Sequence, residues 1–417
     1  MWAVNSNAIP SSPGLDPARM TPQERRTSAA MALVYALRML GLFLVLPVFA
    51  IEARAYPGGD DPALLGLAMG MYGLTQALLQ LPYGMASDRL GRKRVIVAGL
   101  LIFALGSFWA ASAQDLMGLL IGRSLQGAGA VSAAVTALLA DLTRETVRTK
   151  AMALVGASIG LVFALSLVLA PWLTHWVGLQ GLFVLTGVLA LGGIAVVIWG
   201  TPAPPPPQPT QRGRLWEVLR HPALLRLNVG VFVLHAVQLA MWVALPGMLQ
   251  SAGVPVAQHW QVYLPTVLLS FVMLGGVMAL ERRGRLRLAF LGAIAMFGLV
   301  QLGLLQQSLG QPGLVHMVLG LLAFFCAFNA LEAVVPSLSS RLAPAHARGT
   351  ALGVYNTLQS FGLFAGGWAG GAVVKQWGTP MLFLVCALAV LIWLLVAWPM
   401  PVPGRHTPLP EAPGATA

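Results

Sequence analysis

Four ionisable side chains lie inside long apolar stretches of this chain, where an isolated charge is costly. Glu332 is the one carboxylate deep inside such a stretch, and Asn329 and Pro336 lie close to it. A carboxyl group in these surroundings is neutral part of the time and can exchange protons near neutral pH. Glu332 is therefore a candidate proton carrier or a counter-charge for a cationic substrate; the alternative is a structural hydrogen bond between helices.

The other three candidates are Arg38, Arg123 and His235. Arg38 lies roughly eight residues into the first stretch, about 12 Å deep at 1.5 Å per residue, so it cannot easily reach the membrane surface. It either faces a central cavity, where it would attract anionic groups or tune a nearby acid, or it pairs with a polar neighbour. Arg123 could tie its helix to backbone carbonyls of the first helix, and His235 either titrates or is a hydrogen-bonded core residue.

Membrane-spanning helices must position these residues. The chain has 417 residues, of which 57% are hydrophobic and only 9% charged, against about 25% in a soluble protein. Spans need about 20 apolar residues each. We predict twelve, at 30–51, 63–86, 94–112, 116–139, 151–173, 181–200, 225–249, 260–280, 288–308, 313–338, 350–373 and 380–398.

The distribution of positive charge predicts the orientation. With the N-terminus inside, the inner gaps and tails hold 21 of the 25 lysines and arginines, and the outer gaps hold only Arg54 and Lys375. The net charge of +12 is therefore explained by membrane topology, and nucleic acid is not an expected partner. We expect a multi-pass protein of the cell inner membrane with both termini in the cytoplasm.

A proline-rich gap divides the chain into two halves that repeat each other. Residues 88–94 recur as 281–287, Leu46-Pro47 recurs as Leu245-Pro246, and the segment from Arg148 recurs from Arg348. Duplicated six-helix units around a midplane site are a transporter architecture. The predicted organisation is a cytoplasmic tail (1–27), a first half (28–200), a cytoplasmic linker with a possible surface helix (201–224), a second half (225–398) and a cytoplasmic tail (399–417).

Three motifs resemble a known family. Residues 84–93 resemble the loop signature of the major facilitator superfamily, and residues 123–130 resemble its fourth-helix motif. Together with residues 38–47, they make the chain similar to YajR-type members of the drug:proton antiporter group. The resemblance implies a major facilitator fold, all α-helical, with twelve transmembrane helices in two pseudo-symmetric halves. It also links Arg38 to proton coupling and gives Arg123 a part in proton transfer.

The resemblance further implies a conformational latch at the inner loop. Asp88 would face the N-terminus of the eleventh helix near Thr350, where the helix dipole favours negative charge. Arg92 would pair with Asp141, and Gly84 would allow a close approach of the helices. The residues assigned to this latch are Gly84, Asp88, Arg89, Gly91, Arg92 and Asp141.

Polar and aromatic residues in the predicted spans are candidates for the lining of a substrate cavity, because polar groups at this depth tend to face protein or water. They are Tyr35, Tyr72, Gln76, Gln80, Trp242, Asn329, Tyr355, Asn356 and Gln359. No phosphate-binding loop, metal-ligand cluster or catalytic set is found, so neither an enzyme nor a nucleotide-driven pump is expected.

These features predict a secondary active transporter that exports amphipathic or drug-like small molecules in exchange for protons. Protons are the coupling ion, no other cofactor is expected, and the transporter is expected to be a monomer in the lipid bilayer. Two alternatives remain: a proton-coupled importer of a metabolite or organic anion, with Arg38 and Arg123 as anion ligands, and a membrane sensor that does not transport.

Overall fold

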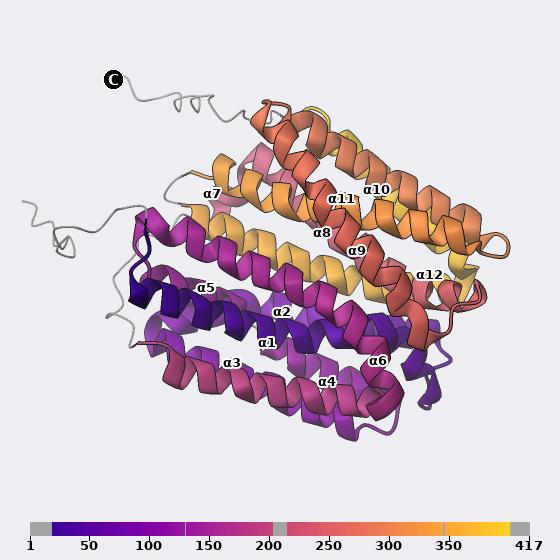
Figure 1. Ribbon diagram of the computed structural model, residues 1–417, viewed down its shortest axis with the longest axis horizontal. Helices are drawn as coiled ribbons and strands as arrows, with labels where there is room; N and C mark the ends of the chain where they lie inside the picture. Colours follow the sequence, from indigo (N-terminus) through magenta and orange to yellow (C-terminus); the bar gives the residue numbers. More distant parts are fainter. Residues whose placement is uncertain (1–18, 130, 203–214, 345–346, 401–417) are drawn as a thin grey trace, which may run out of the picture.

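The computed structural model describes residues 19–129, 131–202, 215–344 and 347–400, and helices form nearly all of them. The first half contains α1 (Pro22–Glu52), η1 (Ala53–Ala55), α2 (Pro62–Leu90), α3 (Arg92–Ser112), α4 (Leu116–Ala128), α5 (Ser132–Asp141) and α6 (Glu145–Gly200). After α7 (Leu215–Arg220), the second half contains α8 (Pro222–Ser251), η2 (Val256–Gln258), α9 (His259–Arg282), α10 (Leu286–Ser308), α11 (Leu314–Leu342) and α12 (Arg348–Ala397). The two halves lie side by side (Figure 1).

The helices agree with the predicted spans. Eight of the described helices are long and apolar enough to cross a membrane. α6 and α12 each contain two of the predicted spans, joined at Gly178 (φ 62°) and Gly378 (φ 81°), where the left-handed backbone requires glycine. With these divisions, the arrangement is consistent with twelve crossings.

One predicted span is not continuous. The helix expected over 116–139 is divided into α4 and α5, and Gly129 at the break has non-helical backbone angles. The chain is closely packed at the break: a Cβ on Gly127 would lie 2.1 Å from the Tyr72 carbonyl oxygen, and one on Gly129 would lie 2.5 Å from the Gly99 carbonyl oxygen. The helix is interrupted where it approaches the backbones of α2 and α3.

The segments expected outside the membrane are described only in part. α1 begins at Pro22, so residues 22–27 of the predicted tail are helical; the helix starts with a capping box formed by Thr21 and Glu24. Arg144 donates to the Glu24 carboxylate at 2.8 Å and so ties this helix start to the α5–α6 loop. In the predicted linker (201–224), α7 (Leu215–Arg220) lies where a surface helix was expected. The remainder, residues 1–18, 203–214 and 401–417, lies outside the described residues.

Glycines of α2 and α12 bring the two halves together. A Cβ on Gly66 would lie 2.2 Å from the Gly367 carbonyl oxygen, and one on Gly70 would lie 2.7 Å from the Phe364 carbonyl oxygen. Towards the start of α12 the glycines are less crowded: a Cβ on Gly353 would lie 3.9 Å from Leu81 Cδ2 of α2, and one on Gly349 would meet nothing within 4 Å. The halves are thus most tightly packed along residues 66–73 of α2 and less tightly packed towards the end that carries α7.

We expect Gly66→Ala to weaken this contact. The added methyl group cannot fit against the α12 backbone, and overpacking of this kind costs about 1–3 kcal/mol. The outer ends should move apart, measured as a longer distance between spin labels at Asp60 and Gln250. Gly303→Ala is the matched control, because a Cβ there meets nothing within 4 Å. An unchanged label distance in Gly66→Ala would contradict the assignment of this contact.

Candidate functional site

Three of the polar residues singled out in the sequence meet in the second half. His235 on α8 lies against Gln359 on α12, with 2.7 Å between their Nε2 atoms. The Oε1 atom of Glu332 on α11 lies 3.2 Å from His235 Nε2. His235 is buried, whereas the side chain of Glu332 is 33% exposed. Glu332 and His235, which the sequence marked as separate candidates, therefore lie beside each other.

The hydrogen bonds around His235 define where its protons lie. Its Nδ1 is 2.9 Å from the Val231 carbonyl oxygen, and because a carbonyl oxygen can only accept, Nδ1 carries a proton. In the neutral ring, Nε2 is then an acceptor that can take a hydrogen bond from the Gln359 amide. Protonated at Nε2, the ring would instead face Glu332 as an ion pair. The contact can hold one exchangeable proton between an imidazole and a carboxylate.

Arg38 is the centre of a second cluster, in the first half. Its guanidinium donates to Tyr72 Oη at 2.6 Å, Ser132 Oγ at 3.0 Å and Gln76 Oε1 at 3.1 Å. The side chain is only 1% exposed, and within the described part of the chain no carboxylate pairs with it. Arg38 therefore has the polar neighbours that the sequence allowed, but it is a buried charge held by neutral groups.

Arg123 packs beside this cluster. Its guanidinium lies over the Tyr72 ring, 5.0 Å from the centroid, and donates to Gln126 Oε1 at 2.9 Å. Gln126 in turn donates to Ser107 Oγ at 2.8 Å. The alternative that Arg123 bonds to backbone carbonyls of α1 is not seen among its contacts with described residues: Arg123 contacts α2, and Gln126 connects α4 to α3.

A hydrogen bond connects the two clusters across the halves. Gln76, which accepts from Arg38, donates through Nε2 to Ser360 Oγ on α12 at 3.0 Å. Ser360 follows Gln359, the residue that contacts His235. Sequence reasoning missed Ser360 and Ser132, although each is a polar residue within a predicted span. The Gln76–Ser360 bond thus links a partner of Arg38 to the residue next to Gln359, the partner of His235.

Not all predicted cavity residues face open space. Tyr35, Tyr72, Gln80, Trp242 and Tyr355 are buried in this conformation, and their assignment to a substrate cavity stays a prediction. The reason for the burial is helix packing: Tyr35 donates to the Ser132 carbonyl oxygen at 2.7 Å, and Trp242 packs edge-on against Tyr263. The partly exposed members are Gln76, Asn329, Asn356 and Gln359. Asn329 donates to Ser270 Oγ at 2.8 Å.

The inner loop contains one of the predicted latch contacts. Arg92 Nε donates to Asp141 Oδ2 at 3.0 Å, as the sequence led us to expect, and Arg92 also pairs with Asp88. Gly91, between α2 and α3, has a φ of 96° that favours glycine, and Arg89 lies in the last turn of α2. The close approach expected at Gly84 is absent, because a Cβ there would lie 3.8 Å from the Ala133 Cβ, an ordinary contact. The role of the loop as a latch stays a prediction.

An ion pair at the opposite end was not predicted. Lys375 Nζ on α12 lies 2.6 Å from Asp61 Oδ2, and Asp61 also caps the N-terminus of α2. The pair joins the two halves, and the hydrogen bond from Lys375 holds the pKa of the Asp61 carboxyl below its usual range. The signal available in the sequence was that Lys375 is one of only two cations in the predicted outer gaps.

We expect Asp61→Asn to increase, by a small factor, the population of molecules whose outer ends are separated. An exposed ion pair contributes about 0.2–1 kcal/mol, which corresponds to roughly a 1.4- to five-fold change in population. Because the pKa of Asp61 is lowered, the pair persists above the ordinary aspartate pKa and is lost only as the pH falls through the lowered value. The distance between labels at Asp60 and Gln250 should therefore be the same at pH 5 and pH 8 in wild type. A distance that changes over this range would contradict the assignment.

Comparisons with known proteins agree with this architecture. The sequence profile of the Major Facilitator Superfamily matches residues 31–367 and 280–416. Among solved structures, an auto-inhibited POT family peptide transporter has a TM-score of 0.73 at 15% identity, over 92% of this chain and 99% of that one. The chain therefore belongs to the Major Facilitator Superfamily: it is a multi-pass membrane transporter and not an enzyme.

Within the superfamily, one similarity covers most of the chain. The chain is 42% identical over 391 residues to the inner membrane transport protein YajR of Escherichia coli (strain K12), which is 92% of this chain and 85% of that protein. A shorter match, 33% over 138 residues, is to the tetracycline resistance protein, class B, of Escherichia coli, covering 32% of this chain and 34% of that protein. The resemblance to YajR-type transporters, inferred from the motifs, is confirmed, and the chain is an inner-membrane protein.

Proposed function

We propose that this transporter exports amphipathic small molecules in exchange for protons and that Glu332 and His235 hold the exchanged proton. The observation that carries the proposal is the 3.2 Å contact between a carboxylate and an imidazole inside the second half. One of the two groups is buried and the other partly exposed, so a proton bound there can reach both an aqueous cavity and the protein interior. The short match to a tetracycline resistance protein supports drug-like substrates.

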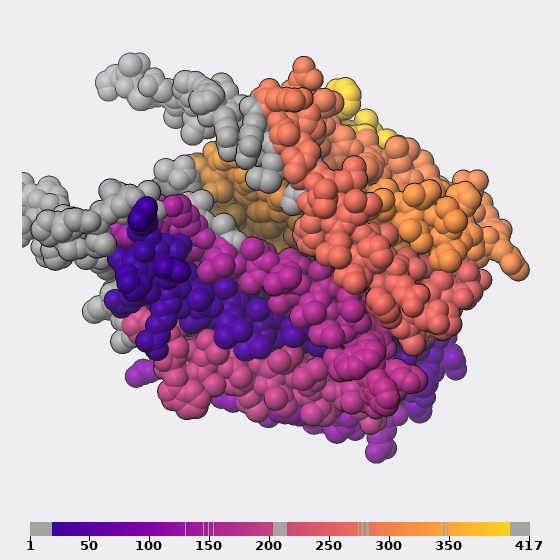
Figure 2. All heavy atoms as spheres, viewed as in Figure 1, coloured from indigo at the N-terminus to yellow at the C-terminus, as the bar shows by residue number. Residues whose placement is uncertain are grey.

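The shape of the molecule supports access to this site from one side. Figure 2 shows a hollow between the two halves at the end that carries α7 and the start of α1. The glycine contacts between α2 and α12 and the Asp61–Lys375 pair close the other end. With the predicted orientation of the termini, the hollow opens to the cytoplasm. An exporter loads its substrate in such a conformation and takes up its proton after the outer end has opened.

The sparse charge of the interior supports a broad substrate class. Besides the His235–Glu332 pair and the buried Arg38 and Arg123, the two central clusters contain neutral amides, hydroxyls and aromatic rings, and cavities with few charged groups bind apolar compounds with few polar contacts. A gradient supplies about 2.3 kcal/mol per charge per 100 mV, in addition to the pH difference. We propose that the transporter works as a monomer, because both clusters are complete within one chain.

A second candidate function is transport of an organic anion. It is favoured by Arg38, whose charge has no carboxylate partner in the described ranges. An anionic substrate could approach the partly exposed Gln76 and Ser132 and receive bonds that Arg38 now makes to them. Burial of Arg38 argues against direct contact in this conformation. A protein that only senses would show neither kind of transport.

Substrate-induced proton movement in proteoliposomes tests the proposal. A pH gradient is imposed, and lipophilic cations and organic anions of matched size are added in turn. Proton release that accompanies uptake of a lipophilic cation is the expected result. A response to organic anions alone would support the second candidate. Wild-type vesicles that respond to neither class, while the protein binds members of the panel in detergent, would favour the sensor.

A further inference from the structure

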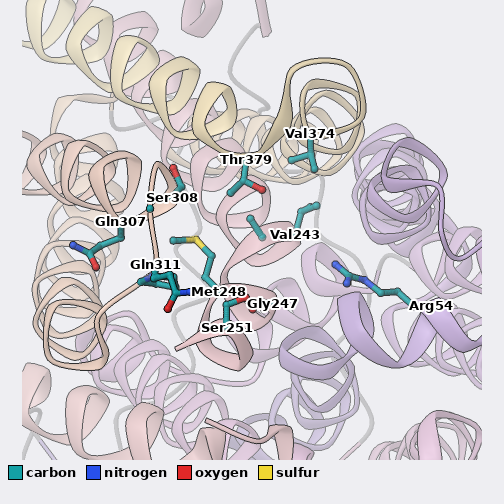
Figure 3. Close-up of a pocket in the computed structure, with 13 residues that line it drawn as sticks. Arg54, Val243, Gly247, Met248, Ser251, Gln307, Ser308, Gln311, Val374 and Thr379 are labelled. Atoms are coloured by element: carbon teal, nitrogen blue, oxygen red, sulfur yellow. Dashed lines mark hydrogen bonds between the residues drawn. The ribbon is translucent and has the colours of Figure 1, made fainter. Parts of the chain in front are cut away.

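At its closed end, the molecule has a second cavity, of about 500 Å³, apart from both central clusters (Figure 3). One wall is Arg54 of η1, from the first half. The other walls belong to the second half: Met248 on α8, Gln307 in the last turn of α10, Gln311 in the α10–α11 connection, and Thr379 on α12. A cavity of this size lies within the range of small-molecule sites. We call it the outer vestibule.

The charge of the outer vestibule is positive and uncompensated. Arg54 is the one charged residue on its wall, and in the part of the chain that the structure describes it forms no ion pair. Figure 3 shows its guanidinium extending from the first half towards Met248 and Gly247. Asp61, an acid of the same outer end, is held by Lys375. A guanidinium in this position attracts an anion and repels a cation.

The remaining polar groups supply hydrogen-bond donors. Gln307 accepts the Gly313 N–H through Oε1 at 2.8 Å, which leaves its NH₂ group free to donate. The amide of Gln311 and the hydroxyl of Thr379 have no hydrogen bond to other described residues. The side chains of Val243, Met248 and Val374 add an apolar surface beside them. One cation, several free donors and an apolar wall match a carboxylate attached to a small hydrophobic group.

We propose that the outer vestibule binds small organic carboxylates from the outer side and that an occupant holds the transporter in this conformation. The effect on conformation follows because the walls of the vestibule belong to different halves of the molecule. Arg54 moves with the first half and the other residues move with the second, so separation of the outer ends would remove the guanidinium from the site. A ligand that binds only one conformation shifts the population towards it. Binding depends only on the vestibule, while its consequence for turnover rests on the proposed function.

Binding of benzoate to the purified full-length chain tests the proposal, with benzamide as the uncharged probe of the same shape. At constant ionic strength, calorimetry should show benzoate binding to wild type and no benzamide binding. Arg54→Gln should weaken benzoate binding at least tenfold, and Arg54→Lys should weaken it less. Arg26→Gln is the matched control, because it removes one exposed arginine at the opposite end and should leave binding unchanged.

Two further variants separate the vestibule from the central clusters. Thr379→Val is nearly isosteric and should weaken benzoate binding several-fold, which gives a second test if Arg54→Gln does not fold. Glu332→Gln should bind benzoate like wild type even if it transports nothing. Equal affinity of wild type and Arg54→Gln, equal affinity for benzoate and benzamide, or no binding to wild type would overturn the proposal.

Discussion

Glu332→Gln is expected to reduce substrate-induced proton flux at least tenfold, to the level of empty vesicles. The amide keeps the shape of the side chain and can still hydrogen-bond, but it cannot release a proton. Oε1 of Glu332 has no hydrogen bond to a described group and only the 3.2 Å contact to His235 Nε2, so the substitution breaks no structural bond there. Substrate binding in detergent should persist. Loss of flux with retained binding distinguishes a proton carrier from a folding defect.

Glu52→Gln is the matched control for this variant. Glu52 is also a partly buried carboxylate, but it is the last residue of α1, at the outer end, and belongs to neither cluster. The proton flux of the Glu52→Gln variant should stay within about two-fold of the wild-type flux. His235→Gln should give an intermediate flux, because Glu332 can still exchange a proton with the cavity but loses its partner. Full flux in Glu332→Gln would exclude this carboxylate as the carrier.

The sequence was sufficient for the spans and the family. Apolar runs of about 20 residues define helices because the membrane leaves no other way to satisfy backbone polar groups. The repeats and the charged inner loop added the division into halves. The break between α4 and α5 was not predicted, and it lies where Gly127 and Gly129 approach the backbones of α2 and α3, which the sequence of one helix does not reveal.

The candidate site could be predicted residue by residue, but not as a set of contacts. Glu332 and His235 were both notable for lying in apolar stretches, yet their contact depends on the rotation and depth of α11 relative to α8. The same dependence explains why Trp242 is packed in the core while Gln76 is partly exposed. Asp61 was overlooked because its partner Lys375 is in the other half, and no local pattern joins them.

The two clusters differ in what they can contribute to a transport cycle. The second half has the groups that can change charge, His235 and Glu332. The first half has two arginines, Arg38 and Arg123, surrounded by neutral donors and acceptors. The Gln76–Ser360 bond joins α2 to α12 between them, and any motion that separates these helices must break it. In the proposed cycle, the second cluster changes its protonation while Arg38 keeps its charge and its bonds to Tyr72 and Ser132.

Arg38→Lys is therefore expected to reduce transport at least tenfold, although it preserves the charge. The guanidinium satisfies Tyr72, Ser132 and Gln76 at once through its planar fork, whereas an ammonium group at the end of a flexible chain cannot reach all three. Hydrogen bonds of charged groups contribute about 1.5–3 kcal/mol each, so the loss of two would cost roughly 3 kcal/mol or more. The thermal unfolding midpoint should fall together with the transport rate.

Gln76→Leu and Arg26→Lys complete the test of this cluster. Gln76→Leu removes the inter-half bond but leaves Arg38 with Tyr72 and Ser132, so the transport rate should fall less than in Arg38→Lys. Arg26→Lys makes the same substitution at an exposed position and should change neither rate nor midpoint. If Arg38→Lys transports at the wild-type rate, the guanidinium fork is not needed and the charge alone suffices. If its midpoint falls while the rate is kept, the cluster stabilises the fold without taking part in coupling.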